Sequence, residues 1–370
     1  MSEVITDSTR PSYEHFGCTC GQAKQIFLQF LIQSRRLHEV ACYGTKRTAR
    51  YIGANIIIDA LRSHMMRKLL ISLGLGRLRL VKKLFSPSQK LGYNITANSY
   101  YSPIPDLREL SDDLWLKRSE LVAIDINEEN QIILLSSFAS RYKTEYDTFP
   151  ENRTRKPYEY YTNNGLFSSV DGGILYCMVR DFKPRIITEV GAGNSTYLSA
   201  KAILKNKEED EQYSCDLLAI DPYPNSTLKK GFPGLTRLID QKVQHVSLCE
   251  FDKLCNNDIL FIDSSHVAKT GSDVEYEYLE ILPRLRKGVI VHIHDIFLPA
   301  EYPRDWLFTF HRFWNEQYIF HAFLSFNESF EVLWAGSYMH LNHATALGRA
   351  FSSYSSDKCW PTSFWIRKTK

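Results

Sequence analysis

Short apolar runs recur through the second half of the chain and are separated by stretches with helical spacing. Five of these runs are predicted to be strands: 185–190, 217–220, 236–239, 258–262 and 289–293. Helical spacing is found around them at three places: 170–180, 195–205 and 272–285. Strands that alternate with helices indicate an α/β fold with a parallel, doubly wound sheet. Two late strands, 330–335 and 363–367, have no long helix between them after residue 340, which suits an antiparallel pair.

The first 165 residues carry weaker patterns. Apolar positions at helical spacing, with basic residues between them, predict a small helical extension at 26–85, and a break is expected at 86–88. Helical spacing returns at 125–138, and the tyrosines that crowd 142–161 suit either a lid over a substrate or ordinary packing. We therefore divide the chain into three parts: a basic helical extension at 1–85, a connecting or lid segment at 86–165, and an α/β domain at 166–370.

Charge is balanced over the whole chain but not locally. The 370 residues include 45 Lys and Arg against 42 Asp and Glu, whereas 35–83 carries twelve basic residues against two acidic ones. We interpret this stretch as a solvated basic face, with peripheral contact to anionic lipid or to an acidic partner as the alternative. Nucleic acid is not expected as a partner, because no DNA-binding motif accompanies the charge.

The cysteines and the apolar runs bear on the compartment. Of the eight cysteines only Cys18 and Cys20 are closely spaced, and no second pair or zinc-finger histidine matches them, so reduced thiols in an intracellular protein are expected. The first 25 residues lack the apolar core of a signal peptide, and no run approaches the ~18 apolar residues of a membrane span. These features predict a cytoplasmic protein.

Carboxylates stand at four predicted strand ends: Glu189, Asp221, Asp263 and Asp295. In a doubly wound sheet, ligands bind at the carboxyl ends of the strands. A carboxylate at such a position needs a ligand or a partner, because an unpaired charge is costly to bury. The sequence therefore predicts a ligand site along this edge of the sheet.

A glycine turn follows the first of these strands. Gly191 and Gly193 allow a tight turn and a close approach of backbone to ligand. The third glycine of a dinucleotide fingerprint is replaced by Thr196, and Glu189 would repel a pyrophosphate, so a nicotinamide-dependent oxidoreductase is disfavoured. Glu189 suits an ammonium group and Asp221 suits the two hydroxyls of a ribose. A ligand with an ammonium, a ribose and no phosphate is S-adenosylmethionine (SAM).

Four segments carry a family resemblance: Glu189-Val-Gly-Ala-Gly-Asn-Ser-Thr196, Ala219-Ile-Asp-Pro-Tyr-Pro224, Asp258-Ile-Leu-Phe-Ile-Asp-Ser-Ser-His266 and Val291-His-Ile-His-Asp-Ile-Phe-Leu-Pro299. Together they resemble the class I SAM-dependent methyltransferases, in particular the bacterial small-molecule branch with a type 24 methyltransferase domain, over about residues 90–370. The resemblance implies a Rossmann-like seven-stranded sheet of order 3-2-1-4-5-7-6 with strand 7 antiparallel, SAM over the glycine loop, and in-line methyl transfer.

The same resemblance implies which residues bind the cofactor: Glu189, Gly191, Gly193, Asn194, Ser195, Asp221, Val243, Gln244, Asp263, Ser264 and Ser265. Glu189, Gly191 and Gly193 would hold the methionine part, Asn194 and Ser195 would contribute from the loop and the helix start, and Asp221 would bind the ribose. Val243 and Gln244 would flank the adenine. The last three would lie near the sulfonium.

Methyl transfer needs a positioned nucleophile and usually a base. His266, His294 and Asp295 are the candidate catalytic residues, and His292 is expected to be a satisfied core histidine. A divalent metal held by Asp263, His266 and Asp295 competes with the metal-free base. Catechol-type O-methyltransferases place Mg²⁺ between acids at these strand ends, but they follow the second acid with an amide side chain where this chain has Ile296.

The acceptor side is expected in an insertion at about 298–329. Its aromatic residues suit a hydrophobic or planar acceptor, and His311, Arg312 and Glu316 are the more exposed-looking polar candidates, with Tyr276 a weaker one. The prediction is a SAM-dependent methyltransferase acting on an oxygen or nitrogen of a small-molecule or peptide-like metabolite. The alternative is a catalytically silent SAM-fold scaffold that docks through its basic extension.

Overall fold

The chain divides into two units, Met1–Pro103 and Ile104–Lys370. The computed structural model describes residues 77–167 and 169–370. The described part of the first unit contains helix α4 (Arg77–Lys90). The break expected at 86–88 is wrong, because α4 continues through it with Pro87 inside the helix, and Ser88 Oγ donates to Phe85 O at 2.9 Å. Most of the predicted basic extension and the pair Cys18 and Cys20 lie outside the described residues.

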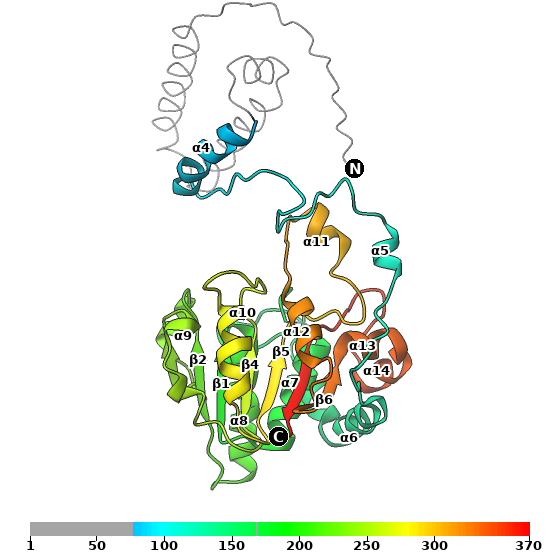
Figure 1. Ribbon diagram of the computed structural model, residues 1–370. Coiled ribbons are helices and arrows are strands. Elements are labelled where there is room, and N and C mark those ends of the chain that lie inside the picture. Colours follow the sequence, from blue (N-terminus) through cyan, green and yellow to red (C-terminus); the bar gives the residue numbers. More distant parts are fainter. Residues whose placement is uncertain (1–76, 168) are drawn as a thin grey trace, which may run out of the picture. The chain divides into compact units, whose positions relative to one another are not determined.

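The second unit is built on one seven-stranded sheet (Figure 1). Its strand order is β3-β2-β1-β4-β5-β7-β6, with β7 antiparallel to both of its neighbours and the other pairs parallel. The order and the antiparallel β7 are as the resemblance predicts. The strands are β1 (Ile186–Val190), β2 (Asp216–Ile220), β3 (Arg237–Ile239), β4 (Ile259–Ile262), β5 (Ile290–Ile293), β6 (Phe330–Ala335) and β7 (Phe364–Lys368).

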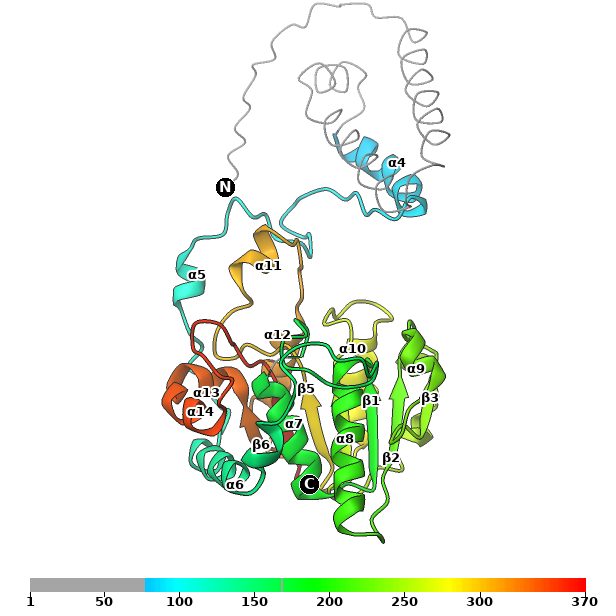
Figure 2. The ribbon, with the colours of Figure 1, turned by 180° about the vertical axis from the view of Figure 1, so that it is seen from behind.

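Helices cover both faces of this sheet. In Figure 1, α10 and α12 lie in front of the strands, and the view from behind in Figure 2 places α7 and α8 on the opposite face. The helices of the unit are α5 (Asp113–Leu116), α6 (Glu128–Tyr146), α7 (Ser169–Phe182), α8 (Asn194–Glu209), α9 (Ser226–Lys230), α10 (Asp273–Tyr276), α11 (Arg304–Phe308), α12 (Glu316–Leu324), α13 (Gly336–Asn342) and α14 (Ala344–Ala350).

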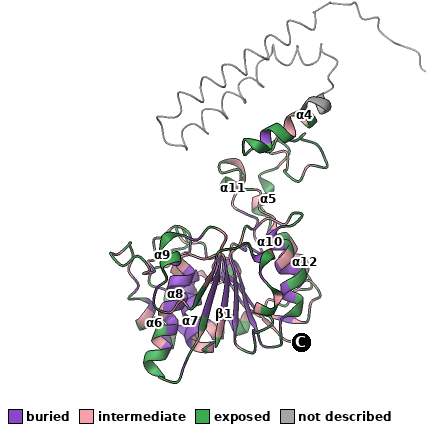
Figure 3. Cartoon of the chain, turned by 90° about the vertical axis from the view of Figure 1, so that its left-hand side faces the viewer, coloured by how far each residue is buried: buried purple, intermediate pink, exposed green. Residues whose placement is uncertain are grey.

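The strands are buried on both faces because successive side chains point to opposite sides. Along β4, Ile259 and Phe261 pack with the helices of the α7–α8 face, while Leu260 and Ile262 pack with those of the α10–α12 face. Figure 3 shows this double burial as strands coloured purple along their length. Continuous apolar runs, rather than alternating ones, are what such strands require.

The predicted helix at 272–285 is present but irregular. It begins as α10 after Ser272, whose Oγ accepts a hydrogen bond from Glu275 N at 3.1 Å. It continues as a π-helical turn (Glu277–Ile281) and ends in a 3-10 turn (Leu282–Arg284) that contains Pro283. The helix predicted at 125–138 is α6, which begins three residues later and runs to Tyr146.

Helix α6 is part of the second unit's core rather than a loose connection. Its Tyr142 and Tyr146 are buried, and Glu145 accepts a hydrogen bond from Arg180 Nε of α7 at 2.9 Å. The division of the chain at 86 and 166 stays a prediction. Among the described residues, no helix has both the length and the apolar character needed to span a bilayer.

Candidate active site

The carboxyl ends of the central strands bring their following residues to one edge of the sheet. Asp221 N donates to the end of β3 at 3.1 Å, Asp263 N to the end of β1 at 2.8 Å, and His294 N to the end of β4 at 3.0 Å. Glu189 lies one residue before the end of β1, and Asp295 follows His294. The four predicted acids therefore share this edge.

The glycine turn after β1 packs directly against the residue that follows β4. Gly191 has a φ of +83°, and a Cβ added to it would lie 1.8 Å from Asp263 O. Gly193 has open space where its Cβ would be, with nothing within 4 Å. Thr196, which replaces the third glycine of a dinucleotide turn, accepts a hydrogen bond from Gly193 N at 2.9 Å and so closes the start of α8. The first glycine is thus required by the fold, and the second leaves room for a ligand.

Glu189 is fully buried, and only one of its two carboxylate oxygens has a hydrogen-bond partner among the described residues. Its Oε1 accepts a hydrogen bond from Ser195 Oγ at 2.5 Å, while its Oε2 has no partner among the described residues. Burial raises the pKa of Glu189 to about 8. An unpartnered buried carboxylate oxygen is costly, and an ammonium group placed beside it would remove that cost.

Asp221 and Gln244 line the neighbouring strand end. Asp221 Oδ2 accepts from Ala192 N at 3.0 Å, which ties it to the glycine turn, and Oδ1 accepts from Tyr223 N at 2.6 Å. Gln244 Nε2 donates to a loop carbonyl at 2.9 Å and leaves its Oε1 buried without a partner in the described chain. Val243, next to it in the chain, is buried. Asp221 and Gln244 thus place polar groups beside the ends of β2 and β3.

Ser264 and Ser265 are already engaged with the helical segment after them. Ser264 Oγ donates to Glu277 Oε2 at 3.0 Å, and Ser265 Oγ donates to Asp273 Oδ1 at 2.5 Å. Burial, reinforced by neighbouring acids, raises the pKa of Glu277 well above its ordinary value. The two serines therefore hold the loop after β4 against α10.

His266 is the centre of a cluster of three carboxylates. Its Nε2 lies 3.2 Å from Asp263 Oδ1 and 3.6 Å from Asp295 Oδ2, and its Nδ1 lies 2.8 Å from Glu316 Oε2. The ring packs on Trp314 with centroids 4.3 Å apart. Burial alone would lower the pKa of His266, but the hydrogen bonds to Asp263 and Glu316 outweigh it and raise the pKa well above its ordinary value. Without another cation, this imidazole holds a second proton.

Glu316 is placed differently from the sequence expectation. It was expected to be exposed and to face the acceptor, but its side chain is fully buried at the start of α12. Its Oε2 accepts from His266, its Oε1 accepts from Tyr278 Oη at 3.1 Å, and its backbone N donates to His266 O at 3.2 Å. An acid in the first turn of a helix is common, so the sequence offers no signal for a partner fifty residues away.

His294 lies beside the cluster, next to its member Asp295. His294 Nε2 is 3.8 Å from Asp295 Oδ1, which also accepts from Thr362 Oγ1 at 3.2 Å. Burial raises the pKa of Asp295 against the opposing effect of His294 and His266. For Asp263, burial acts in the same sense, but His294 and His266 prevail and its pKa is lowered.

His292 is a core histidine, as expected, but it is not a satisfied one. It stacks on Phe261 with ring centroids 3.8 Å apart, and neither ring nitrogen has a hydrogen-bond partner within the described ranges. Burial lowers the pKa of His292 well below its ordinary value. The ring therefore packs as a neutral aromatic group.

The remaining acceptor candidates, His311, Arg312 and Tyr276, lie outside the His266 cluster. His311 and Arg312 are exposed. The Arg312 guanidinium lies over the rings of Trp306 and Trp314, 5.2 and 5.3 Å from their centroids, and is thus one ring away from His266. Tyr276 donates to a backbone carbonyl next to the Gln244 turn at 3.2 Å and takes no part in the cluster.

Asp263, His266 and Asp295 fit a divalent cation. Each offers one ligand atom, and these atoms lie within 4.8 Å of one another. A metal-binding histidine typically donates its other N–H to a carboxylate, and Glu316 occupies that position. One nitrogen and two carboxylate oxygens are a donor set suited to Mn²⁺, Fe²⁺ or Zn²⁺.

Comparison with known proteins bears on the domain that contains this edge of the sheet. Residues 188–296 match a family model described as a methyltransferase domain. An uncharacterized protein of Archaeoglobus fulgidus is 31% identical over 182 residues, which cover 47% of this chain and 80% of the relative. A solved structure titled "CmcI-N160 apo-structure" is 13% identical, with a TM-score of 0.29 over 54% of this chain and 71% of that one, a similarity too low to bear on the fold. The strand order agrees with the matched domain, and the chain contains a methyltransferase domain of the class I, SAM-dependent family.

Proposed function

We propose that this protein transfers the methyl group of SAM to an oxygen or nitrogen of a small-molecule or peptide-like acceptor, with a His/Asp cluster that takes up the acceptor's proton. One observation carries this proposal. The Gly191 turn lies against Asp263, and Asp263 also contacts His266 Nε2 at 3.2 Å. The cofactor loop and the proton-accepting cluster therefore meet at one residue.

The cofactor supplies an activated methyl group, and the residues present fit it. The unpartnered Oε2 of Glu189 would accept a hydrogen bond from the ammonium of the methionine part. The open space at Gly193 admits the ligand against the backbone. Asp221 would accept from the ribose hydroxyls, and Gln244 Oε1 would face the adenine. An intact cradle of this kind counts against the silent-scaffold alternative.

On the acceptor side, His266 Nε2 is the atom that takes the proton, and Asp263 and Asp295 stabilise the imidazolium that forms. Glu316 holds Nδ1 and so fixes which nitrogen faces the acceptor. Because the pKa of His266 lies well above its ordinary value, the base is active only in the deprotonated fraction. Methyl transfer is therefore expected to accelerate as the pH rises.

A divalent cation is the second candidate occupant of this cluster. The placement of Asp263, His266 and Asp295, with Glu316 behind the histidine, supports it. Such a cation would lower the pKa of a bound acceptor hydroxyl and replace the second proton of His266. Calorimetric titration with Mn²⁺ separates the two cases: an Asp295→Asn variant loses the binding heat if the cluster is a metal site, and wild type gives no heat if it is not.

Titration with S-adenosylhomocysteine tests the cofactor site. Wild type is expected to bind at about micromolar Kd, and Asp221→Asn is expected to weaken binding by at least about tenfold, because charge-assisted hydrogen bonds contribute roughly 1.5–3 kcal/mol. Asp216→Asn is the matched control, since Asp216 is exposed at the opposite end of the same strand. Absence of saturable heat with wild type would refute the proposal.

Catalysis is tested separately from binding. Glu316→Gln keeps the shape of the side chain but removes the charge that holds His266 Nδ1. With labelled SAM and a cell extract as the source of acceptor, this variant is expected to lose most of the methyl transfer while it binds S-adenosylhomocysteine normally. A protein that binds the nucleoside but labels nothing in any extract would instead be the silent scaffold.

A further inference from the structure

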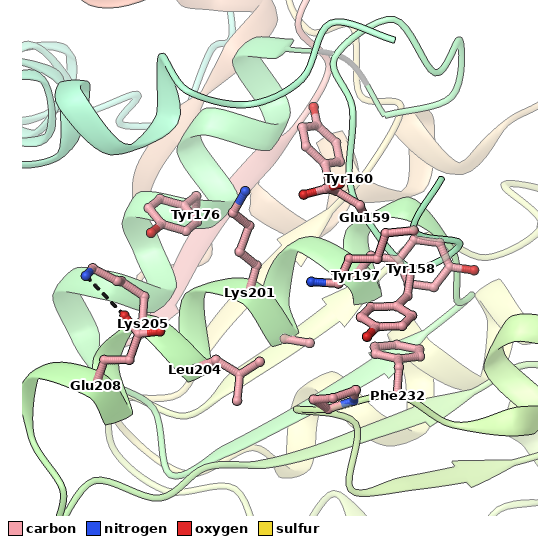
Figure 4. A pocket seen from close by; sticks show the side chains of 13 residues that line it. Tyr158, Glu159, Tyr160, Tyr176, Tyr197, Lys201, Leu204, Lys205, Glu208 and Phe232 are labelled. Atoms are coloured by element: carbon pink, nitrogen blue, oxygen red, sulfur yellow. Dashed lines mark hydrogen bonds and ion pairs between the residues drawn. The ribbon is translucent and has the colours of Figure 1, made fainter. Parts of the chain in front are cut away.

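A hollow lies on the face of α8, apart from the strand-end residues described above. Its volume is about 240 Å³, and it is open on one side (Figure 4). None of the cofactor or cluster residues line it. One face of α8 forms its floor, at spacings of three and four residues: Tyr197, Ala200, Lys201, Leu204, Lys205 and Glu208. The segment 156–160 and the residues Phe232 and Pro233 supply the walls.

Aromatic rings form one wall of this hollow. Tyr158 stacks on Phe232 with centroids 5.5 Å apart and an interplanar angle of 11°. Tyr197 meets Phe232 edge-on at 5.2 Å. A wall of rings of this kind favours an aromatic ligand, because aromatic pairs gain energy beyond the area they bury, in edge-to-face as well as stacked geometry.

Two ammonium groups in the hollow have no carboxylate partner. Lys201 Nζ lies 4.8 Å above the Phe149 ring and Lys156 Nζ lies 5.0 Å above the Tyr158 ring. Neither lysine forms a salt bridge within residues 77–167 and 169–370. In Figure 4 the Lys201 side chain rises from α8 into the hollow. Lys201 is half-buried and Lys156 is exposed, and ammonium groups that contact only rings are positioned for an anion.

The acids of the hollow are occupied by other groups. Glu208 Oε2 lies 3.2 Å from Lys205 Nζ, and Glu159 Oε2 accepts from Thr154 Oγ1 at 2.6 Å. Burial lowers the pKa of Lys201, and Lys156 adds to this effect while Glu159 opposes it. An anion beside Lys201 would relieve both the burial and the repulsion from the second lysine.

We propose that this hollow binds a small planar ring that carries a phosphate or carboxylate. The ring would pack against the rings of Tyr158 and Phe232, and the anion would lie between Lys156 and Lys201. A second site for a charged aromatic molecule is independent of the methyl-transfer proposal, since it shares no residue with the cofactor edge or the His266 cluster.

Calorimetry with phenyl phosphate tests this site in the full chain, with S-adenosylhomocysteine at saturation so that the nucleoside site is filled. Wild type is expected to bind phenyl phosphate, and Lys201→Gln is expected to weaken it at least about tenfold. Lys207→Gln is the matched control, because Lys207 is an exposed lysine of the same helix that does not line the hollow. Lys156→Gln, at an exposed position on the opposite wall, repeats the test if Lys201→Gln fails to fold.

Two comparison ligands separate the parts of the proposal. Benzyl alcohol has the ring without the charge, and inorganic phosphate has the charge without the ring, so both are expected to bind at least about tenfold more weakly than phenyl phosphate. The proposal is overturned if wild type gives no saturable heat with phenyl phosphate, if Lys207→Gln weakens binding as much as Lys201→Gln, or if inorganic phosphate binds as tightly as phenyl phosphate.

Discussion

If Glu189 binds the cofactor as proposed, its buried carboxyl is expected to make cofactor binding depend on pH. In the folded protein its pKa is about 8, against an ordinary value of 4.5, because burial disfavours the charged form. For a carboxyl raised in this way, the folded state binds more protons than the unfolded state between the two values. Its contribution to the free energy of unfolding is fully present below pH 4.5. This contribution, about 5 kcal/mol in total, is lost as the pH rises through 8.

A ligand ammonium reverses this balance, because it favours the ionised carboxylate. If the nucleoside binds only the ionised form of Glu189, its apparent affinity is the intrinsic affinity multiplied by the fraction of the protein in which Glu189 is ionised. With a pKa of about 8, affinity is expected to rise nearly tenfold per pH unit from about pH 6 and to level off above about pH 8. At neutral pH, binding should release close to one proton.

Isothermal titration with S-adenosylhomocysteine measures both quantities, since the heat in two buffers of different ionisation enthalpy gives the proton release. Glu189→Gln is the control, because an amide cannot titrate and its affinity should be flat over the same range and below that of wild type at about pH 9. A wild-type Kd that does not change between about pH 6 and pH 8, or a Glu189→Gln variant with the same pH dependence, would refute the reasoning.

Two further predictions separate structural from functional positions. Gly191→Ala should lower the free energy of unfolding by more than about 1 kcal/mol in chemical denaturation, because its φ is positive and the added Cβ meets Asp263 O. Gly193→Ala, where the space is open, should keep its stability and weaken nucleoside binding instead. Arg180→Met should cost roughly 3–5 kcal/mol of stability, because it strands the partly buried Glu145, and an undiminished melting temperature would contradict this.

The sheet and its carboxylate edge could be predicted because they depend on local rules. Apolar runs of four to six residues mark strands buried on both faces, and parallel connections send every strand end to the same edge. Glu189, Asp221 and Asp263 then follow from their positions at the ends of those runs. A break at Pro87 could be predicted by the same kind of rule and was wrong, since α4 runs through Pro87 to Lys90 although a proline inside a helix removes one hydrogen bond.

The insertion could not be predicted in the same way. Its polar residues carry no periodicity that tells Glu316, which is buried, from Arg312, which is exposed. The difference arises because α12 begins with Glu316 directly beneath the His266 loop, a tertiary contact between distant segments. The tyrosines at 142–161 also differ in position because of tertiary contacts that the sequence does not show. Tyr142 is buried in the core, whereas Tyr158 lines the hollow on α8.

The His266 cluster draws on two sources that differ in how freely they can change. Asp263 and Asp295 come from strand ends, whose positions are fixed by the sheet. Glu316 comes from the insertion, and it holds both the ring of His266, through Oε2, and the backbone of His266, through its own N–H. The segment that carries the exposed Arg312 therefore also orients the ring of His266, so, if His266 is the base we propose, changes in the insertion that alter acceptor choice are expected to alter the rate of transfer as well.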